Sequence, residues 1–199
     1  MIEVEIKVKI LDSDKIKNEF IRKKGTYKCS LVHEDTYFKM PEGLRDFQET
    51  DEALRIRKST EFNKYDENTK QQVRYFLTYK GPKINLYTKT RKEIESLIKE
   101  GDKVFEIFKL LGFREVYTVK KEREMYLFEY KHSEIEALID YIPILDTYFL
   151  EVESQVESPN DSEEIQDLLF NFLAELGIKK EQSIRKSYLE LVMEHLEHE

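Results

Sequence analysis

The chain has a single cysteine, Cys29, in 199 residues. One cysteine allows neither an internal disulfide nor a cysteine-rich zinc site, which fits a reducing compartment and leaves Cys29 as a small core residue. No run of apolar residues approaches the length of a membrane span, and the first segment alternates in polarity where a signal peptide would be apolar. These absences predict a cytoplasmic protein without a membrane partner.

The sequence also lacks the glycine-rich loops that commonly bind phosphate. Lys80-Gly81-Pro82 has neither the preceding glycine nor the following hydroxyl residue of a P-loop, and no dinucleotide-binding fingerprint is present. The formal net charge of -8 at pH 7 argues against nucleic acid as a partner. The four histidines are too scattered for a zinc site, and no serine has a histidine and an acid at the spacing of a catalytic triad.

What the sequence has in abundance is charge. Charged residues make up 37% of the chain and hydrophobic residues 40%. A chain of this length can bury a sizeable core and needs no more than one domain, so we predict a single domain over residues 1–199. The high share of charge predicts strongly charged surfaces or a charged cavity.

The spacing of apolar residues predicts an α+β protein. Helical spacing with terminal capping signals predicts helices at 12–24, 102–111, 161–177 and 183–197. A period of two predicts strands at 2–10, 53–58, 73–80, 87–95, 116–128, 134–141 and 149–156. About eight strands, mostly consecutive and too close together for βαβ crossovers, indicate an antiparallel sheet.

Several of these strands alternate charged and apolar side chains. Glu3, Glu5 and Lys7 share one face of the first strand, and Glu151 and Glu153 repeat the spacing near residue 150. For any single strand, a solvent-facing surface explains such a pattern. Four amphipathic helices, however, need apolar sheet surface to cover, so the charged faces must point inward. We therefore predict a closed antiparallel barrel with a wet, charged interior and helices packed outside.

The charges inside this predicted barrel have two signs, and each suits a different ligand. Arginine guanidinium groups and lysine ammonium groups bind phosphate oxygens. The candidate phosphate-binding residues are Lys7, Arg55, Arg57, Lys80, Lys121 and Arg123. Paired carboxylates suit the hard ions Mg²⁺ and Mn²⁺. A polyphosphate bound together with divalent cations satisfies both requirements.

Eight motifs in order along the chain resemble those of CYTH proteins, the triphosphate tunnel metalloenzymes named for class IV adenylyl cyclase and thiamine triphosphatase. The motifs are Glu3-x-Glu5-x-Lys7, Asp35-Thr36-Tyr37-Phe38, Ala53-Leu54-Arg55-Ile56-Arg57, Leu77-Thr78-Tyr79-Lys80-Gly81-Pro82, Arg91-Lys92-Glu93-Ile94-Glu95, Lys121-Glu122-Arg123, Ile139-Asp140 and Glu151-Val152-Glu153. The resemblance extends from residue 2 to about residue 191. One departure is Ile144-Leu145-Asp146-Thr147, where relatives commonly have a glycine-rich turn.

The resemblance implies an eight-stranded antiparallel tunnel, a triphosphate substrate such as ATP, and Mg²⁺ or Mn²⁺. It implies that Glu3, Glu5, Glu151 and Glu153 hold or orient metal, assisted by Glu93, Glu95 and Asp140. It adds Arg91 and, from the C-terminal segment, Lys186 to the phosphate-binding cations named above. The implied catalytic group is Glu3, Glu5, Lys7, Glu151 and Glu153. The relatives also suggest a homodimer.

The chemistry is left open among three hypotheses. The first is a class IV adenylyl cyclase-like enzyme that converts ATP to cyclic AMP and pyrophosphate. The second is a triphosphatase that hydrolyses inorganic triphosphate, thiamine triphosphate or a nucleoside triphosphate. The third is a non-catalytic protein that binds polyphosphate, which the complete set of carboxylate pairs makes less favourable. No residue in the sequence decides between the first two.

Overall fold

The computed structural model describes residues 2–66, 68–83, 91–158 and 161–198, which contain eight strands and four α-helices. The strands are β1 (Ile2–Ile10), β2 (Thr26–Lys39), β3 (Ala53–Phe62), β4 (Gln72–Lys80), β5 (Arg91–Ile98), β6 (Arg114–Tyr130), β7 (Ser133–Ile142) and β8 (Thr147–Val156). The helices are α1 (Ser13–Arg22), α2 (Gly101–Leu110), α3 (Ser162–Glu175) and α4 (Tyr188–Glu197), with short 3-10 turns η1 (Pro143–Leu145) and η3 (Lys180–Gln182). No helix among these residues is both long and apolar enough to cross a membrane.

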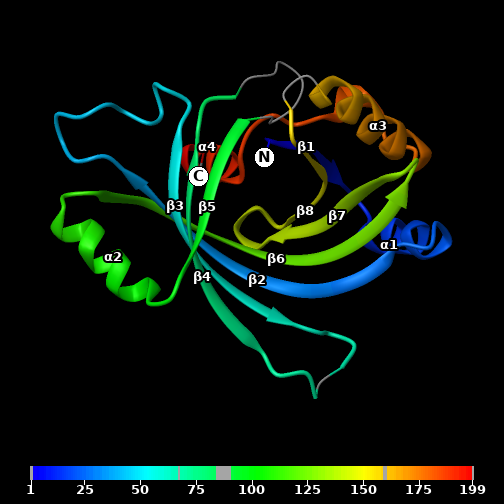
Figure 1. Ribbon diagram of the computed structural model, residues 1–199, viewed down its shortest axis with the longest axis horizontal. Helices are drawn as coiled ribbons and strands as arrows, with labels where there is room; N and C mark the ends of the chain where they lie inside the picture. The colour runs from blue at the N-terminus through cyan, green and yellow to red at the C-terminus, as the bar shows by residue number, and fades with distance from the viewer. Residues whose placement is uncertain (1, 67, 84–90, 159–160, 199) are drawn as a thin grey trace.

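The eight strands form a closed antiparallel barrel in the order β1-β5-β4-β3-β2-β6-β7-β8 (Figure 1). This confirms the predicted fold class. Among the described residues, β1 pairs with β5 at Ile2 with Lys92 and at Glu3 with Arg91. On its other side, β1 pairs with β8 along its whole length and brings Glu5 opposite Glu153.

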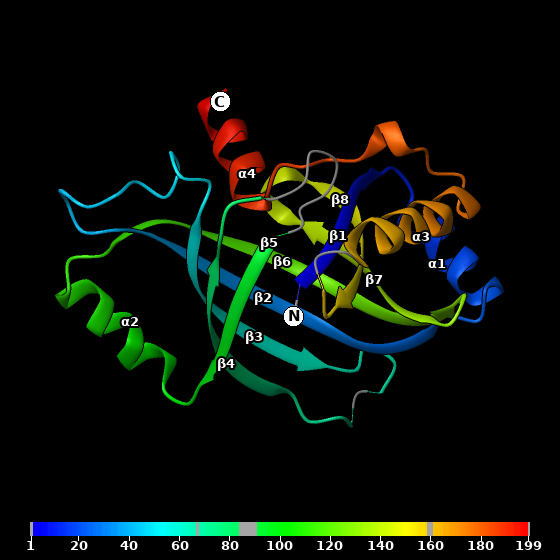
Figure 2. The ribbon, with the colours of Figure 1, turned by 45° about the horizontal axis from the view of Figure 1, so that its top comes forward.

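The main hydrophobic core lies outside the barrel, as the amphipathic helices require. Val4, Ile6 and Val8 of β1 are almost completely buried against residues such as Phe20 of α1 and Leu169 of α3. Figure 2 shows α1 and α3 on the same side of the barrel, with α2 at the opposite end. Burying one such side chain contributes about 1.5–3 kcal/mol, so the outer core fixes which strand faces point inward.

Helix α4 begins later in the chain than the sequence predicts. It was expected from residue 183, but it begins at Tyr188, with Ser187 as its N-cap. Residues before the cap follow the barrel instead, since the Ile184 amide donates to the Lys7 carbonyl at 2.7 Å. The helix lies over one end of the barrel, where Tyr188 and Val192 pack against Phe149 and neighbouring side chains.

Two strands also differ from the predicted set. Strand β2 was not identified, because its inward face carries His33 and Asp35 and because a bulge between Tyr27 and Cys29 interrupts its alternation. Cys29 itself is buried, as expected. The strand predicted over 87–95 is described only from Arg91 onward, and residues 84–90 lie outside the described part of the chain.

The turn between β7 and β8 is built without glycine. The chain forms the 3-10 turn η1 and then places Asp146 in the left-handed region, with φ 42° and ψ 49°. Aspartate is among the few residues that adopt this region readily. The Tyr141 hydroxyl donates to the Asp146 carboxylate at 2.7 Å and helps to fix the turn. Ile144 and Leu145 pack toward α4.

Candidate functional site

A cavity of about 730 Å³ lies inside the barrel, a size suited to a small-molecule ligand. Side chains of β1 to β6 and β8 line it, and α4 contributes at one end. Because alternate residues of a strand face the same side, the charged faces project into this cavity. The predicted site residues in its lining are Glu3, Glu5, Arg55, Arg57, Lys80, Arg91, Glu93, Glu95, Lys121, Arg123, Glu151 and Glu153.

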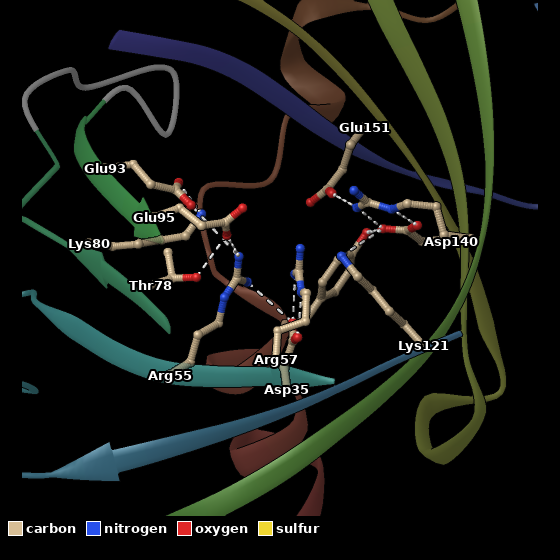
Figure 3. A network of polar contacts seen from close by, with 12 residues as sticks. Asp35, Arg55, Arg57, Thr78, Lys80, Glu93, Glu95, Lys121, Asp140 and Glu151 are labelled. Atoms are coloured by element: carbon tan, nitrogen blue, oxygen red, sulfur yellow. Dashed lines mark hydrogen bonds and ion pairs between the residues drawn. The ribbon is translucent and has the colours of Figure 1, made fainter. Parts of the chain in front are cut away.

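Two arginines of β3 are held in place by one carboxylate of β2 (Figure 3). Arg57 donates to Asp35 through Nε at 2.6 Å and Nη2 at 2.8 Å, and Arg55 donates to the same carboxylate at 3.2 Å. Burial raises the pKa of Asp35, but the two arginines outweigh burial and hold that pKa well below 3.8. The carboxylate is therefore ionised and fixes both guanidinium groups before any ligand binds.

A second network joins β6, β7 and β8. Arg123 makes a two-pronged contact with Asp140, with both distances 2.6 Å, and also donates to Glu151 at 2.5 Å. The Lys121 amine lies 3.5 Å from Asp140. Burial and the neighbouring Arg123 lower the pKa of Lys121 to about 8, so its amine is charged at neutral pH at a free-energy cost. An anion in the cavity would relieve that cost.

A third network joins β3, β4 and β5. The Lys80 amine contacts Glu93 at 2.5 Å, and Arg55 lies 3.7 Å from Glu93 and 3.8 Å from Glu95. The Thr78 hydroxyl donates to Glu95 at 2.8 Å. Burial raises the pKa of Glu93, but the nearby charges of Lys80 and Arg55 outweigh burial. The pKa of Glu93 therefore lies below 4.5, and the group is ionised. These carboxylates already have cationic partners, and their predicted assistance to a metal stays a prediction.

Three carboxylates gather at the opposite wall. Oxygens of Glu3 and Glu5 from β1 and of Glu153 from β8 lie within 4.8 Å of one another. Burial, together with the neighbouring carboxylates, raises the pKa of Glu3 to about 7 and the pKa of Glu153 well above 4.5. Crowding of like charges is unfavourable unless a cation or protons neutralise it. The donor set consists of oxygens only, which fits Mg²⁺ or Mn²⁺.

Lys7 points inward but lies behind the cavity wall. Its side chain is fully buried, and its amine lies 3.9 Å from the centre of the Tyr188 ring. The Tyr188 hydroxyl donates to Asp140 at 2.8 Å, so α4 is connected to the Arg123 network. The structure therefore gathers Lys7 and Asp140 next to the other predicted residues, while Tyr188 covers Lys7.

Lys186 is the one predicted residue that the described structure does not bring to the site. It is about half exposed and pairs with Glu194 of α4 at 2.6 Å, outside the cavity lining. The prediction assumed that the helix continues through residue 186. Because the helix begins after the Ser187 cap, Lys186 projects from the segment that precedes it.

Four functional candidates were missed as individual site residues. Asp35 and Tyr188 organise the cations, His33 lines the cavity, and Lys83 contacts Asp51 at 2.8 Å near α4. Asp35 belongs to the motif Asp35-Thr36-Tyr37-Phe38 named above. The two-residue spacing of His33 and Asp35 could have indicated that both side chains face the cavity. The contacts of Tyr188 with Asp140 and of Lys83 with Glu190 depend on where α4 docks, for which the local sequence carries no signal.

Comparisons with known proteins show which family this chain resembles. A family model described as "CYTH domain" matches residues 1–188. A protein of Methanocaldococcus jannaschii, named "Putative adenylate cyclase MJ0240", is 43% identical over 192 residues, which cover 96% of this chain and 98% of the relative.

Solved structures show the same architecture. The PH1819 protein of Pyrococcus horikoshii is 37% identical, with a TM-score of 0.82 over 97% of this chain and 99% of that chain. HpAC1 of Hippeastrum, described as a "Putative adenylyl cyclase" that reveals a dominant triphosphatase activity, is 17% identical, with a TM-score of 0.65. The alignment covers 97% of this chain and 96% of HpAC1, and at this identity it supports the fold alone.

Proposed function

Because the chain belongs to the CYTH domain family, we propose that it is a metal-dependent enzyme that acts on triphosphate substrates inside its tunnel. The observation that carries the proposal is the pairing of two charge types across one cavity. Arg55 and Arg57 project from β3, while Glu3, Glu5 and Glu153 project from the opposite wall formed by β1 and β8. A metal-bound polyanion matches both walls.

The cations of this chain would bind the phosphates. Arg57 and Arg123 are held by Asp35 and Asp140, so little side-chain entropy is lost when they contact phosphate oxygens. Lys121, on the same face of β6 as Arg123, and Lys80 of β4 add ammonium groups to the lining of the cavity. Their combined charge would stabilise the negative charge that develops on a polyphosphate leaving group.

Glu3, Glu5 and Glu153 would hold a divalent ion, which when bound would polarise a phosphoryl group and offset its charge. The structure supports this role through the donor chemistry and the mutual repulsion of the three carboxylates. Glu151 already accepts from Arg123, which suggests that it orients the arginine more than it holds metal.

The first proposed reaction is cyclisation of ATP. The ribose 3′ oxygen would attack the α-phosphorus, forming the new ester bond, while the bond from the α-phosphorus to the bridging oxygen of the β-phosphate breaks. The electron pair leaves with pyrophosphate, and the hydroxyl proton passes to solvent. The name of the Methanocaldococcus jannaschii relative favours this reaction. The arginines and lysines would hold the departing pyrophosphate.

The second proposed reaction is hydrolysis of the triphosphate. Water would attack the terminal phosphorus while the bond from that phosphorus to the bridging oxygen of the next phosphate breaks. Orthophosphate is released, the electron pair leaves with the diphosphate, and a proton of the water passes to solvent. The description of HpAC1 names a triphosphatase activity in a protein of the same fold, so the fold itself is compatible with this alternative. The same residues would bind the substrate, so the two reactions differ in which oxygen attacks and in which phosphorus it attacks.

Product analysis separates the two reactions. The protein is incubated with ATP and, separately, with tripolyphosphate in the presence of Mg²⁺ or Mn²⁺, and products are followed by phosphorus NMR after chelation of the metal. We expect cyclic AMP and pyrophosphate from ATP. Orthophosphate from either substrate would instead support hydrolysis. Tight binding without turnover would contradict both reactions and indicate a polyphosphate-binding protein, and no binding would contradict the tunnel as a triphosphate site.

A further inference from the structure

His33 is a buried titratable residue to which the proposed reactions give no role. It lies on β2, opposite Ser59 of β3 and Lys121 of β6, and its side chain lines the cavity. Only 4% of the residue is exposed. It therefore projects into the tunnel beside the phosphate-binding cations.

The Nδ1 atom of His33 makes no hydrogen bond within the described part of the chain. Leaving a buried polar atom without a partner is energetically unfavourable, so such atoms are uncommon in folded proteins. Those that occur at the wall of a cavity are candidates for ligand contacts. Among the residues that the structure describes, His33 thus has an unpartnered, buried ring nitrogen and belongs to the lining of the cavity.

The charges that face His33 keep its ring neutral. Burial lowers its pKa well below 6.5, and Arg57 of β3 and Lys121 and Arg123 of β6 lower it further. Asp35, two residues along the same strand, acts in the opposite direction but is already shared by two arginines. Protonation would add another cation to a cationic wall.

A bound triphosphate reverses this balance. Its oxygens accept hydrogen bonds, and its several negative charges offset Arg57, Lys121 and Arg123. The imidazole would then gain both an acceptor for its N–H group and a favourable electric field. A proton taken from the buffer converts the neutral ring to imidazolium, with an N–H on each nitrogen.

We propose that His33 is a further ligand of the triphosphate chain and that it becomes protonated when the chain binds. The proposal rests on the proposed function, because it assumes that a triphosphate occupies the tunnel. It assigns His33 to a phosphate oxygen near Arg57 and Lys121. It also predicts that substrate binding draws a proton into the site.

Nitrogen NMR of protein labelled at histidine tests the proposal. The probe is a methylene-bridged triphosphate, which resists cleavage, added at about pH 6.5 with Mg²⁺, and Mg²⁺ alone is the reference. Only four histidines are present, and His33→Asn identifies the His33 signals. The matched control is His132→Asn, at an exposed turn position with φ 67° that asparagine tolerates.

We expect the two His33 nitrogens to give the well-separated signals of a neutral ring with Mg²⁺ alone and the closely spaced signals of imidazolium with the triphosphate. We also expect His33→Asn to bind the triphosphate about tenfold more weakly, whereas His132→Asn binds like wild type. Binding that leaves His33 neutral, or equal affinity of His33→Asn and wild type, would overturn the proposal alone. Absence of binding by wild type would overturn the proposed function as well.

Discussion

Replacing Glu153 with glutamine is expected to abolish metal-dependent turnover while leaving the fold intact. Glu153 is one of the three carboxylates within 4.8 Å of one another, and a neutral amide is a much weaker ligand for a hard cation. Losing metal stabilisation worth several kcal/mol lowers turnover by at least about 100-fold. Steady-state kinetics with saturating Mg²⁺ measures the loss.

The same substitution should not destabilise the metal-free protein. Glu153→Gln removes a charge that Glu3 and Glu5 repel, so its melting temperature should equal or exceed that of wild type. Addition of Mg²⁺ should raise the melting temperature of wild type but not that of the variant. Glu134→Gln, at an exposed position on β7, is the control and should behave like wild type. Full activity of Glu153→Gln would reject the metal role.

Replacing Asp35 with asparagine should have the opposite effect on stability. Asp35 is almost completely buried and holds Arg55 and Arg57, so its loss leaves one buried and one partly buried guanidinium group without their shared counter-charge. Breaking a buried ion pair in this way lowers the free energy of unfolding by about 3 kcal/mol. Chemical denaturation of Asp35→Asn and wild type measures the difference. Tripolyphosphate should restore part of the loss, because its phosphates replace the missing charge.

The pH dependence of that difference provides a further check. The pKa of Asp35 is depressed in the folded protein, so its contribution to stability is present above about pH 3.8 and is lost as the pH falls toward the folded pKa. The gap between wild type and Asp35→Asn should therefore narrow below about pH 4. Asp167→Asn, at an exposed position on α3, should show no gap at any pH. A stability of Asp35→Asn equal to that of wild type near pH 7 would show that the buried network is not needed for folding.

Much of the fold could be predicted because helices must cover the apolar face of a sheet, and this requirement fixes which face of each strand points inward. Val4, Ile6 and Val8 alternate with Glu3, Glu5 and Lys7, and helices need the apolar face, so the charged face had to turn inward. This argument requires no knowledge of strand pairing. Strand β2 was missed because its inward face mixes His33 and Asp35 with the apolar Leu31, and because its periodicity breaks at a bulge.

The sequence indicates which residues belong to the site, but it does not indicate which of them contact one another. Arg123 follows Lys121 by two residues, so a shared face was evident from the sequence. Its partner Asp140 depends on the register of β6 against β7, which long-range packing sets. Tyr188 could not be linked to Asp140, because the link exists only after α4 docks on the barrel. Sequence periodicity identifies a face, whereas tertiary structure decides which charges meet.

A crystal structure with Mn²⁺ and a methylene-bridged triphosphate tests most directly the claim that this barrel interior binds a metal-bound polyanion. The manganese anomalous signal should lie in contact with the carboxylates of Glu3, Glu5 and Glu153, and the phosphates should contact Arg57, Lys121 and Arg123. Manganese and phosphates on the outer surface, with the three carboxylates free of metal, would contradict the account.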